Sequence, residues 1–117
     1  VVAGKRVETG GPISDLILNA NGSSHAYIVK RGRWNLAVIE GRRGRKFDSI
    51  EGLRFSPDFK TVSYRGTSEG KQVIVLNDQI SEEFEEATDP VWSPDSRKVA
   101  FAARKGNEIW WKVMKVK

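Results

Sequence analysis

The side chains with the clearest capacity to bind a partner are basic. The chain has 20 Lys and Arg residues against 15 Asp and Glu residues, which leaves a formal net charge of +5. The binding candidates fall into two groups, one at the glycine-containing connectors between expected strands and one in a single basic run. They are Arg31, Arg33, Lys71, Lys105 and Asn107 at the connectors, and Arg42, Arg43, Arg45 and Lys46 in the run. Basic patches steer anionic partners to a surface, although charged residues on strand edges also serve only to prevent aggregation.

Residue types and motifs used in catalysis are sparse. His25 is the one histidine, and a Ser–His–Asp site needs a geometry that no local pattern indicates. The sequence has no Gly-x-Ser-x-Gly elbow and no glycine-rich phosphate loop that ends in Lys-Ser/Thr. It also has no cysteine, and oxygen ligands such as Asn77-Asp78 are too sparse for a calcium loop. The sequence therefore predicts a protein that is not an enzyme and that has no cofactor and no metal.

The adjacent tryptophans Trp110-Trp111 could form a platform on which a ligand stacks. On a strand, the two rings point to opposite faces of the sheet. Inner strands of stacked sheets are buried on both faces, so we expect core packing rather than a ligand platform. One ring is expected to pack between two sheets, and the other to pack at the opposite face or to remain exposed.

The elements that must position all these residues follow from a repeat of 37 residues. Phe55-Ser56-Pro57-Asp58 recurs as Trp92-Ser93-Pro94-Asp95, and aromatic residues stand at the same spacing as Tyr27, Tyr64 and Phe101. A fixed period of this length is typical of repeat architectures, in which one unit cannot bury its own apolar surface. The period therefore predicts three similar units that pack against one another.

Each unit has the pattern of four short strands. Pro57-Asp58 favours a tight turn, and Val62-Ser63-Tyr64-Arg65 then alternates between apolar and polar residues as a half-buried strand does. A connector and an apolar third strand follow, and a more polar fourth strand is expected around residues 45–48 and 83–85. The third unit is expected to have the shortest connector. The sequence thus predicts an all-β fold of three four-stranded antiparallel repeats, arranged as β-propeller blades and forming half of a six-bladed ring.

The two motif copies resemble the TolB-type, WD-like β-propeller repeat family. The shared residues are Phe55-Ser56-Pro57-Asp58 with Val62-Ser63-Tyr64, and Trp92-Ser93-Pro94-Asp95 with Val99-Ala100-Phe101. The likeness covers residues 53–117 and is weaker in the first unit, where Asn19-Ala20-Asn21-Gly22 replaces the motif. Phe59 and Ser96 stand where the family usually has glycine, which leaves the turn type open. The resemblance implies a propeller that serves as a binding or scaffolding platform.

The repeat also predicts how the chain is divided. Residues 1–12 are expected to form an outer strand that completes another blade. Blade 1 is expected at residues 13–52, blade 2 at 53–89, and blade 3 at 90–117 without its outer strand. Three blades are fewer than the ~4 that usually close a ring. Either two chains exchange terminal strands to form a homodimer, or the sequence is part of a longer propeller.

Three functions are compatible with these observations. The leading hypothesis is a non-catalytic propeller that binds a protein or peptide through the loops at the channel mouth, because loops on a rigid scaffold often carry binding residues. The alternatives are an accessory or gating propeller of a larger prolyl-oligopeptidase-like hydrolase, and a basic surface that binds polyanions such as nucleic acid. No apolar run reaches the ~20 residues that span a bilayer, and the compartment, periplasmic or cytoplasmic, is left open.

Overall fold

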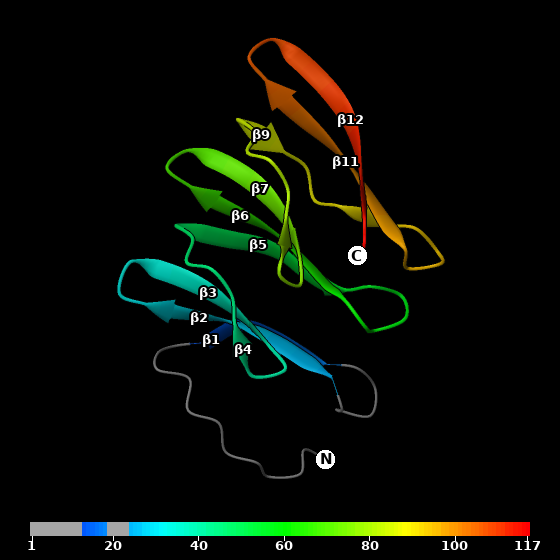
Figure 1. The fold of residues 1–117 in the computed structure, drawn as a ribbon. Helices are drawn as coiled ribbons and strands as arrows, with labels where there is room; N and C mark the ends of the chain where they lie inside the picture. The colour runs from blue at the N-terminus through cyan, green and yellow to red at the C-terminus, as the bar shows by residue number, and fades with distance from the viewer. Residues whose placement is uncertain (1–12, 19–23) are drawn as a thin grey trace.

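The computed structural model describes residues 13–18 and 24–117 as three antiparallel sheets, and no helix occurs among these residues (Figure 1). Sheet 1 consists of β1 (Ile13–Leu18), β2 (His25–Arg31), β3 (Trp34–Ile39) and β4 (Arg42–Arg43). Sheet 2 consists of β5 (Ser49–Phe55), β6 (Val62–Ser68), β7 (Lys71–Leu76) and β8 (Gln79–Ile80). Sheet 3 consists of β9 (Glu86–Ala87), β10 (Val91–Trp92), β11 (Lys98–Lys105) and β12 (Glu108–Lys115). The predicted all-β class and the three four-stranded antiparallel sheets are confirmed.

The strands of sheets 1 and 2 pair in chain order, whereas sheet 3 differs at its first strand. There, β9 and β10 both pair with one edge of β11, and β12 pairs with the other edge. Pro90 lies between β9 and β10, at the repeat position where the ladders of β1 and β5 also have a register shift. Sheet 2 begins at Ser49 and sheet 3 at Glu86, a few residues before the expected boundaries at 53 and 90. The outer strand expected at residues 1–12 lies outside the described residues.

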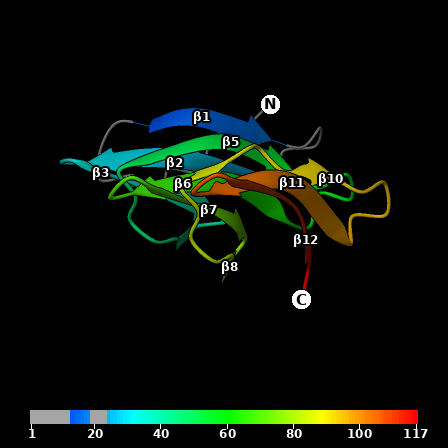
Figure 2. The ribbon, with the colours of Figure 1, turned by 90° about the horizontal axis from the view of Figure 1, so that it is seen from above.

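The three sheets stack face to face in chain order, as Figure 1 shows from the side and Figure 2 along the stack. We call the face of a sheet that is turned toward the next sheet its forward face, and the opposite face its backward face. On the backward face of sheet 2, Tyr64 packs in one core with Ile28 of sheet 1. On the forward face of sheet 2, Ile74 packs in a second core with Phe101 of sheet 3. The described residues form an open stack without a closed ring, so the propeller stays a prediction.

The 37-residue repeat extends to the hydrogen-bond register. Each hairpin between a second and a third strand closes with a two-residue turn: Gly32-Arg33, Glu69-Gly70 and Gly106-Asn107. Glu69 has a φ of 52° and Gly70 a φ of 77°, the left-handed values that a tight hairpin turn requires. The prediction that the third unit has the shortest connector is wrong, because all three turns have the same length.

The Ser-Pro-Asp motif forms the turn between the first and second strands of sheets 2 and 3. The Ser56 hydroxyl donates to the Asp58 carboxylate over 2.6 Å and accepts from the Thr61 amide over 3.1 Å. The Lys60 amide donates to the same carboxylate oxygen over 3.0 Å. The second copy repeats this network, with Ser93 donating to Asp95 over 2.6 Å. The motif therefore stabilises the turn through its own side chains, which explains why these residue types recur.

The position after the aspartate has the same backbone conformation in both turns. Phe59 has a φ of 60° and Ser96 a φ of 63°, in the left-handed region that non-glycine residues rarely adopt. The question that these two residues raised about the turn type is thus answered: the glycine conformation is retained without the glycine. Ser96 also accepts a hydrogen bond from the Asp58 amide over 3.0 Å, which joins the turn of sheet 3 to that of sheet 2.

The fourth strand of sheets 1 and 2 is split into two pieces. β4 and β8 are two-residue strands, and single bridges, Asn35 with Phe47 and Gln72 with Phe84, follow them. The expected polar strands at 45–48 and 83–85 therefore appear only as these bridges. Phe47 and Phe84 are buried and pack edge-on against Tyr64 and Phe101. These two phenylalanines, 37 residues apart, close the two cores at their outer margin.

Polar contacts also join sheets 2 and 3. The indole N–H of Trp92 donates to the buried Ser63 hydroxyl over 3.0 Å. Arg65 extends from β6, pairs with Asp89 over 3.2 Å and donates to the Ala87 carbonyl over 3.0 Å, while Glu51 of its own sheet pairs with it over 2.6 Å. The contacts with Trp92, Asp89 and Ala87 fix the position of the third sheet on the second.

Candidate functional site

The predicted binding residues begin at two opposite ends of the strands. The connector residues, Arg31, Arg33, Lys71, Lys105 and Asn107, lie in or beside the two-residue turns that end β2, β6 and β11. The basic run, Arg42, Arg43, Arg45 and Lys46, begins at the far end of β3 and then runs back along it, since the next residue, Phe47, bridges Asn35 near the first connector. Only Arg42 and Arg43 therefore lie at the end opposite the connectors.

The connector end of the stack is a row of exposed side chains. All five connector residues are exposed, and the three turns follow one another from sheet 1 to sheet 3 (Figure 1). The Arg33 guanidinium lies 4.3 Å from the ring centre of Trp34, and Lys105 pairs with Glu82. Two of the four cations are thus engaged within the protein, which weakens the case for an anion site at this end.

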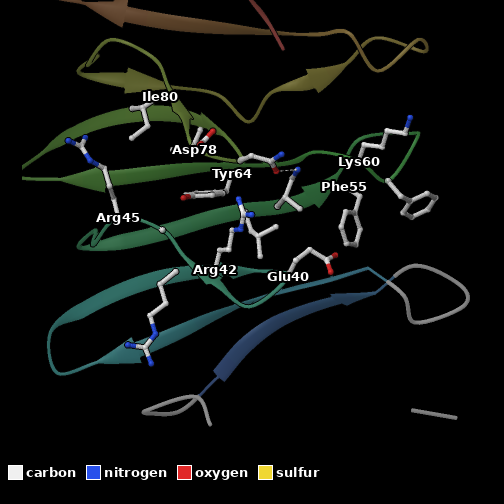
Figure 3. A pocket seen from close by; sticks show the side chains of 15 residues that line it. Glu40, Arg42, Arg45, Phe55, Lys60, Tyr64, Asp78 and Ile80 are labelled. Atoms are coloured by element: carbon white, nitrogen blue, oxygen red, sulfur yellow. Dashed lines mark hydrogen bonds between the residues drawn. The ribbon is translucent and has the colours of Figure 1, made fainter. Parts of the chain in front are cut away.

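The basic run borders a pocket of about 760 Å³ between sheets 1 and 2. Its cationic lining residues are Arg42, Arg43, Arg45 and Lys60, and Figure 3 shows Arg45 and Lys60 toward opposite ends of the lining with Arg42 between them. Apolar and aromatic side chains form the rest of the wall, among them Phe55 and Tyr64. Lys46 does not line the pocket. Sequence reasoning missed Lys60, Phe55 and Tyr64 as site residues, because they come from a different repeat from the arginines.

Arg43 is separated from its neighbours by strand alternation. Arg42 pairs with Ile39, which packs on the core between sheets 1 and 2, whereas Arg43 pairs with Val38 of a small cluster apart from that core. Side chains of directly paired residues share a face of the sheet. Although Arg43 borders the pocket, its side chain therefore projects to the opposite face from Arg42.

The surroundings of Tyr64 and Glu40 in the pocket determine the protonation and hydrogen bonding of these two side chains. Burial raises the pKa of Tyr64 to about 12, so its hydroxyl is protonated and able to donate at neutral pH. Glu40 lines the pocket, but one of its oxygens accepts the His25 amide over 3.0 Å. A Cβ at Gly44 would lie 3.0 Å from the Tyr64 hydroxyl and 3.3 Å from the Ala37 carbonyl, so glycine lets the chain pass close to this wall.

Three of the four glutamates in the acidic run Glu82, Glu83, Glu85 and Glu86 form ion pairs with cations of sheet 3. Arg104 pairs with Glu85 over 2.9 Å and with Glu86 over 3.2 Å, and Glu82 pairs with Lys105 and Lys112. The hydrogen bond from Lys105 lowers the pKa of Glu82. Acidic charge near sheet 3 is therefore largely balanced by cations of β11 and β12.

Both tryptophans of the Trp110-Trp111 pair are exposed, so the expected core packing is wrong. Trp111, on the forward face of sheet 3, is 85% exposed, and Trp110, on the backward face, is 46% exposed with the Lys112 ammonium 5.4 Å from its ring centre. The expectation failed because it assumed a sheet on each side of β12. No further sheet covers this strand among the described residues.

The surroundings of His25 indicate a structural role. Its ring stacks on Tyr27, with ring centres 6.4 Å apart and planes within 8°. Within residues 13–18 and 24–117, no group of three or more His, Asp or Glu side chains is arranged to hold a metal ion. In the same ranges, no helix is long and apolar enough to cross a membrane.

No protein-family model matches this chain, and neither a curated protein nor a solved structure matches it. The resemblance to TolB-type repeats therefore remains a hypothesis that rests on the two motif copies and the 37-residue period.

Proposed function

We propose that this chain is a non-catalytic scaffold that binds protein, and that its partner continues the stack of sheets beyond sheet 3. The observation that carries the proposal is the exposure of the forward face of sheet 3. Trp111 and Val113 are 85% and 61% exposed, whereas their counterparts 37 residues earlier, Ile74 and Leu76, are 0% and 2% exposed. Exposed apolar patches of this kind mark protein interaction sites.

The core between sheets 2 and 3 shows what fits such a face. Ile74 and Leu76 are covered by Val99 and Phe101, which belong to the backward face of the following sheet. Trp111 and Val113 repeat the same positions in the same register, since Ala102 pairs with Trp111 as Arg65 pairs with Ile74. The surface complementary to sheet 3 is therefore the backward face of another sheet of this type.

This chain has such a face on sheet 1. Ile13, Leu16 and Leu18 of β1 are all about half exposed, and Ile13 and Leu18 pair with Val29 and His25 of the backward face. The counterpart of Ile13 in sheet 2, Ile50, is buried. One chain thus carries both halves of the sheet-to-sheet contact at its two ends. A head-to-tail contact between two such chains closes into a ring when the rotation permits.

The edge of sheet 3 supports the same partner. β12 pairs with β11 and with no second strand among the described residues, so its outer edge carries unpaired N–H and C=O groups, except that the Lys115 carbonyl accepts a hydrogen bond from Gln79 over 2.8 Å. Such an edge accepts a strand from another chain. We therefore propose a homodimer in which sheet 1 of one chain covers sheet 3 of the other. The connector residues Arg31, Arg33, Lys71, Lys105 and Asn107 remain the predicted contacts for a further protein or peptide.

Light scattering on purified protein tests the proposal. A dimer has twice the 13.1 kDa of the chain, and we expect this mass at micromolar concentration. The double variant Trp111→Lys, Val113→Lys places two charges on the forward face of sheet 3 and should give the monomer mass. Circular dichroism of the variant checks that the sheets are retained.

Phe59→Lys is the matched control, because Phe59 is a large apolar residue that is also half exposed but lies in a turn. This variant should remain a dimer. A wild-type mass of 13.1 kDa at all concentrations would refute the second copy as partner. Equal loss of the dimer in the control would show that the forward face of sheet 3 is not the contact.

A further inference from the structure

The pocket between sheets 1 and 2 is a site of a different kind from the faces at the ends of the stack. It lies within the chain, between two sheets that are already packed, and none of its lining residues belongs to sheet 3. Its occupation does not depend on self-association. Its volume of about 760 Å³ falls in the range of small-molecule sites.

The cations of this pocket form no ion pair. Arg42, Arg45 and Lys60 are in none of the ion pairs of the described residues, which join cations and carboxylates of sheets 2 and 3. Lys60 interacts electrostatically with Asp58. The three cations face two carboxylates of the lining, Glu40 and Asp78, and Glu40 already accepts the His25 amide. The pocket therefore holds more positive charge than its own acids neutralise.

Neutral donors add to the cations. The Asn77 carbonyl oxygen accepts the Val62 amide over 2.8 Å, which leaves the amide nitrogen of Asn77 without a partner among the described residues. The protonated Tyr64 hydroxyl likewise has no hydrogen-bond partner in these ranges. Donors without acceptors on the wall of a pocket are suited to an anionic group.

The rest of the wall is apolar and aromatic. Ile39, Phe55, Val75 and Ile80 line the pocket together with the ring of Tyr64. A hydrated inorganic ion gains nothing from contact with these apolar surfaces, whereas the apolar body of an organic acid is stabilised by it. The pocket therefore suits a ligand that carries both an anionic group and an apolar body.

We propose that this pocket binds a small organic anion, in which one anionic group contacts Arg42, Arg45 or Lys60 and an aromatic or aliphatic body contacts Phe55 and Tyr64. The anionic group is a phosphate or a carboxylate, since the guanidinium fork matches both. The site is a binding site without a reaction.

Calorimetric or NMR titration with four probes tests the proposal. Phenyl phosphate and phenylacetate carry an anionic group on an aromatic body, whereas inorganic phosphate and acetate are the corresponding groups alone. We expect at least one of the aromatic anions to bind about tenfold or more tightly than its bare anion, because the apolar body adds its own burial. The comparison of the two aromatic anions identifies the anionic group.

Substitutions place the ligand in the pocket. Arg42→Gln and Arg45→Gln should each weaken binding about tenfold, the usual size of a lost charged hydrogen bond. Arg54→Gln is the matched control with the same charge change, because Arg54 pairs with Ser63 on the forward face of sheet 2 and does not line the pocket. It should leave affinity nearly unchanged. NMR spectra of each variant confirm that it is folded.

Three results would overturn the proposal. One is that neither aromatic anion binds better than its bare anion. Another is that Arg54→Gln weakens binding as much as Arg42→Gln, which indicates an unspecific effect of net charge. The third is that a single-stranded oligonucleotide binds while the small anions do not, which indicates an extended polyanion surface. None of these outcomes depends on whether the chain dimerises.

Discussion

Ile74 and Trp111 occupy the same place in successive repeats, yet Ile74 is inaccessible to solvent and Trp111 is 85% exposed. Both are large apolar residues on the third strand of a sheet, and both lie on its forward face. What differs is the neighbour, since sheet 3 covers Ile74 and no described residue covers Trp111. The comparison teaches that the burial of a residue in a repeat depends on whether another sheet stacks on its face. An apolar residue type shows only that the face is suited to packing against another sheet.

The largest expected effect separates the covered face from the open one. Leu76→Ala should lower the free energy of unfolding by about 2–5 kcal/mol, because it leaves a cavity between sheets 2 and 3. Its counterpart Val113→Ala should change it by less than about 0.5 kcal/mol in dilute solution, where that face is open. Urea denaturation of both variants measures the difference. An equal loss in dilute solution would contradict the exposure of the forward face of sheet 3.

The next comparison concerns how each core accommodates its phenylalanine. A Cβ at Gly66 would lie 2.7 Å from the ring of Phe47, whereas Ala103, the counterpart of Gly66, already has a Cβ in the core that holds Phe84. Gly66→Ala should therefore destabilise the protein by about 1–3 kcal/mol through overpacking. Ala103→Gly should cost only about 0.5–1 kcal/mol.

Denaturation of a third variant decides whether the ring is the cause. Phe47→Leu in the Gly66→Ala background replaces the ring by a smaller side chain and should recover some of the lost stability. If the double variant lost more stability than the sum of the losses of the two single variants, the clash with Phe47 would not explain the effect.

A smaller effect compares the two motif turns. Phe59→Gly should stabilise the protein by about 0.5–1 kcal/mol, because the residue has a φ of 60° that costs an L-residue energy. Ser96→Gly should give a smaller gain, since it also removes the hydrogen bond from the Asp58 amide. Thermal or urea unfolding of both variants tests the order. A larger gain for Ser96→Gly would show that this bond contributes less than the contact between the Phe59 and Phe55 rings, whose centres lie 5.5 Å apart and which Phe59→Gly removes.

The smallest effect is the pH dependence of the same turns. The hydrogen bonds from Ser56 and Ser93 lower the pKa of Asp58 and Asp95 below the ordinary value of 3.8. A lowered folded-state pKa contributes stability above the unfolded-state pKa, and this contribution is lost as the pH falls through the folded-state value. Asp58→Asn should therefore reduce the loss of stability between about pH 5 and pH 2. Asp78→Asn is the control, because the Asp78 carboxylate accepts no hydrogen bond from the described residues. An equal change in this control would contradict the role of the motif.

Much of the fold could be predicted from the sequence, because the repeat consists of residues with strong local preferences for turn or strand conformation. Proline and aspartate in the motif determine the turn, and alternation at Val62 to Arg65 determines a strand with one face in each core. Phe47 and Phe84 were missed as core residues because they stand among charged residues, although their spacing of 37 was a usable signal. The length of the third connector was mispredicted because local apolar patterns do not fix a hairpin register.

The candidate sites could be predicted only in part. The basic run was visible, but its division between two faces depends on the pairing of Arg42 with Ile39 and of Arg43 with Val38. The wall opposite the arginines, which includes Phe55, Lys60 and Tyr64, comes from the second repeat. Nothing in the spacing of 37 residues indicates that sheets 1 and 2 leave a cavity at this place. The pairing of the acidic run with Arg104 and Lys105 likewise required two segments to meet.

The sequence by itself determined the units: three repeats of strand, turn and hairpin, and the residues whose side chains hold each turn. Local backbone preference and side-chain alternation act over a few residues, so they are readable from the chain. The tertiary structure alone decided which faces are covered, which arginines line the same pocket as Tyr64, and where the stack remains open. These features depend on contacts between residues dozens of positions apart.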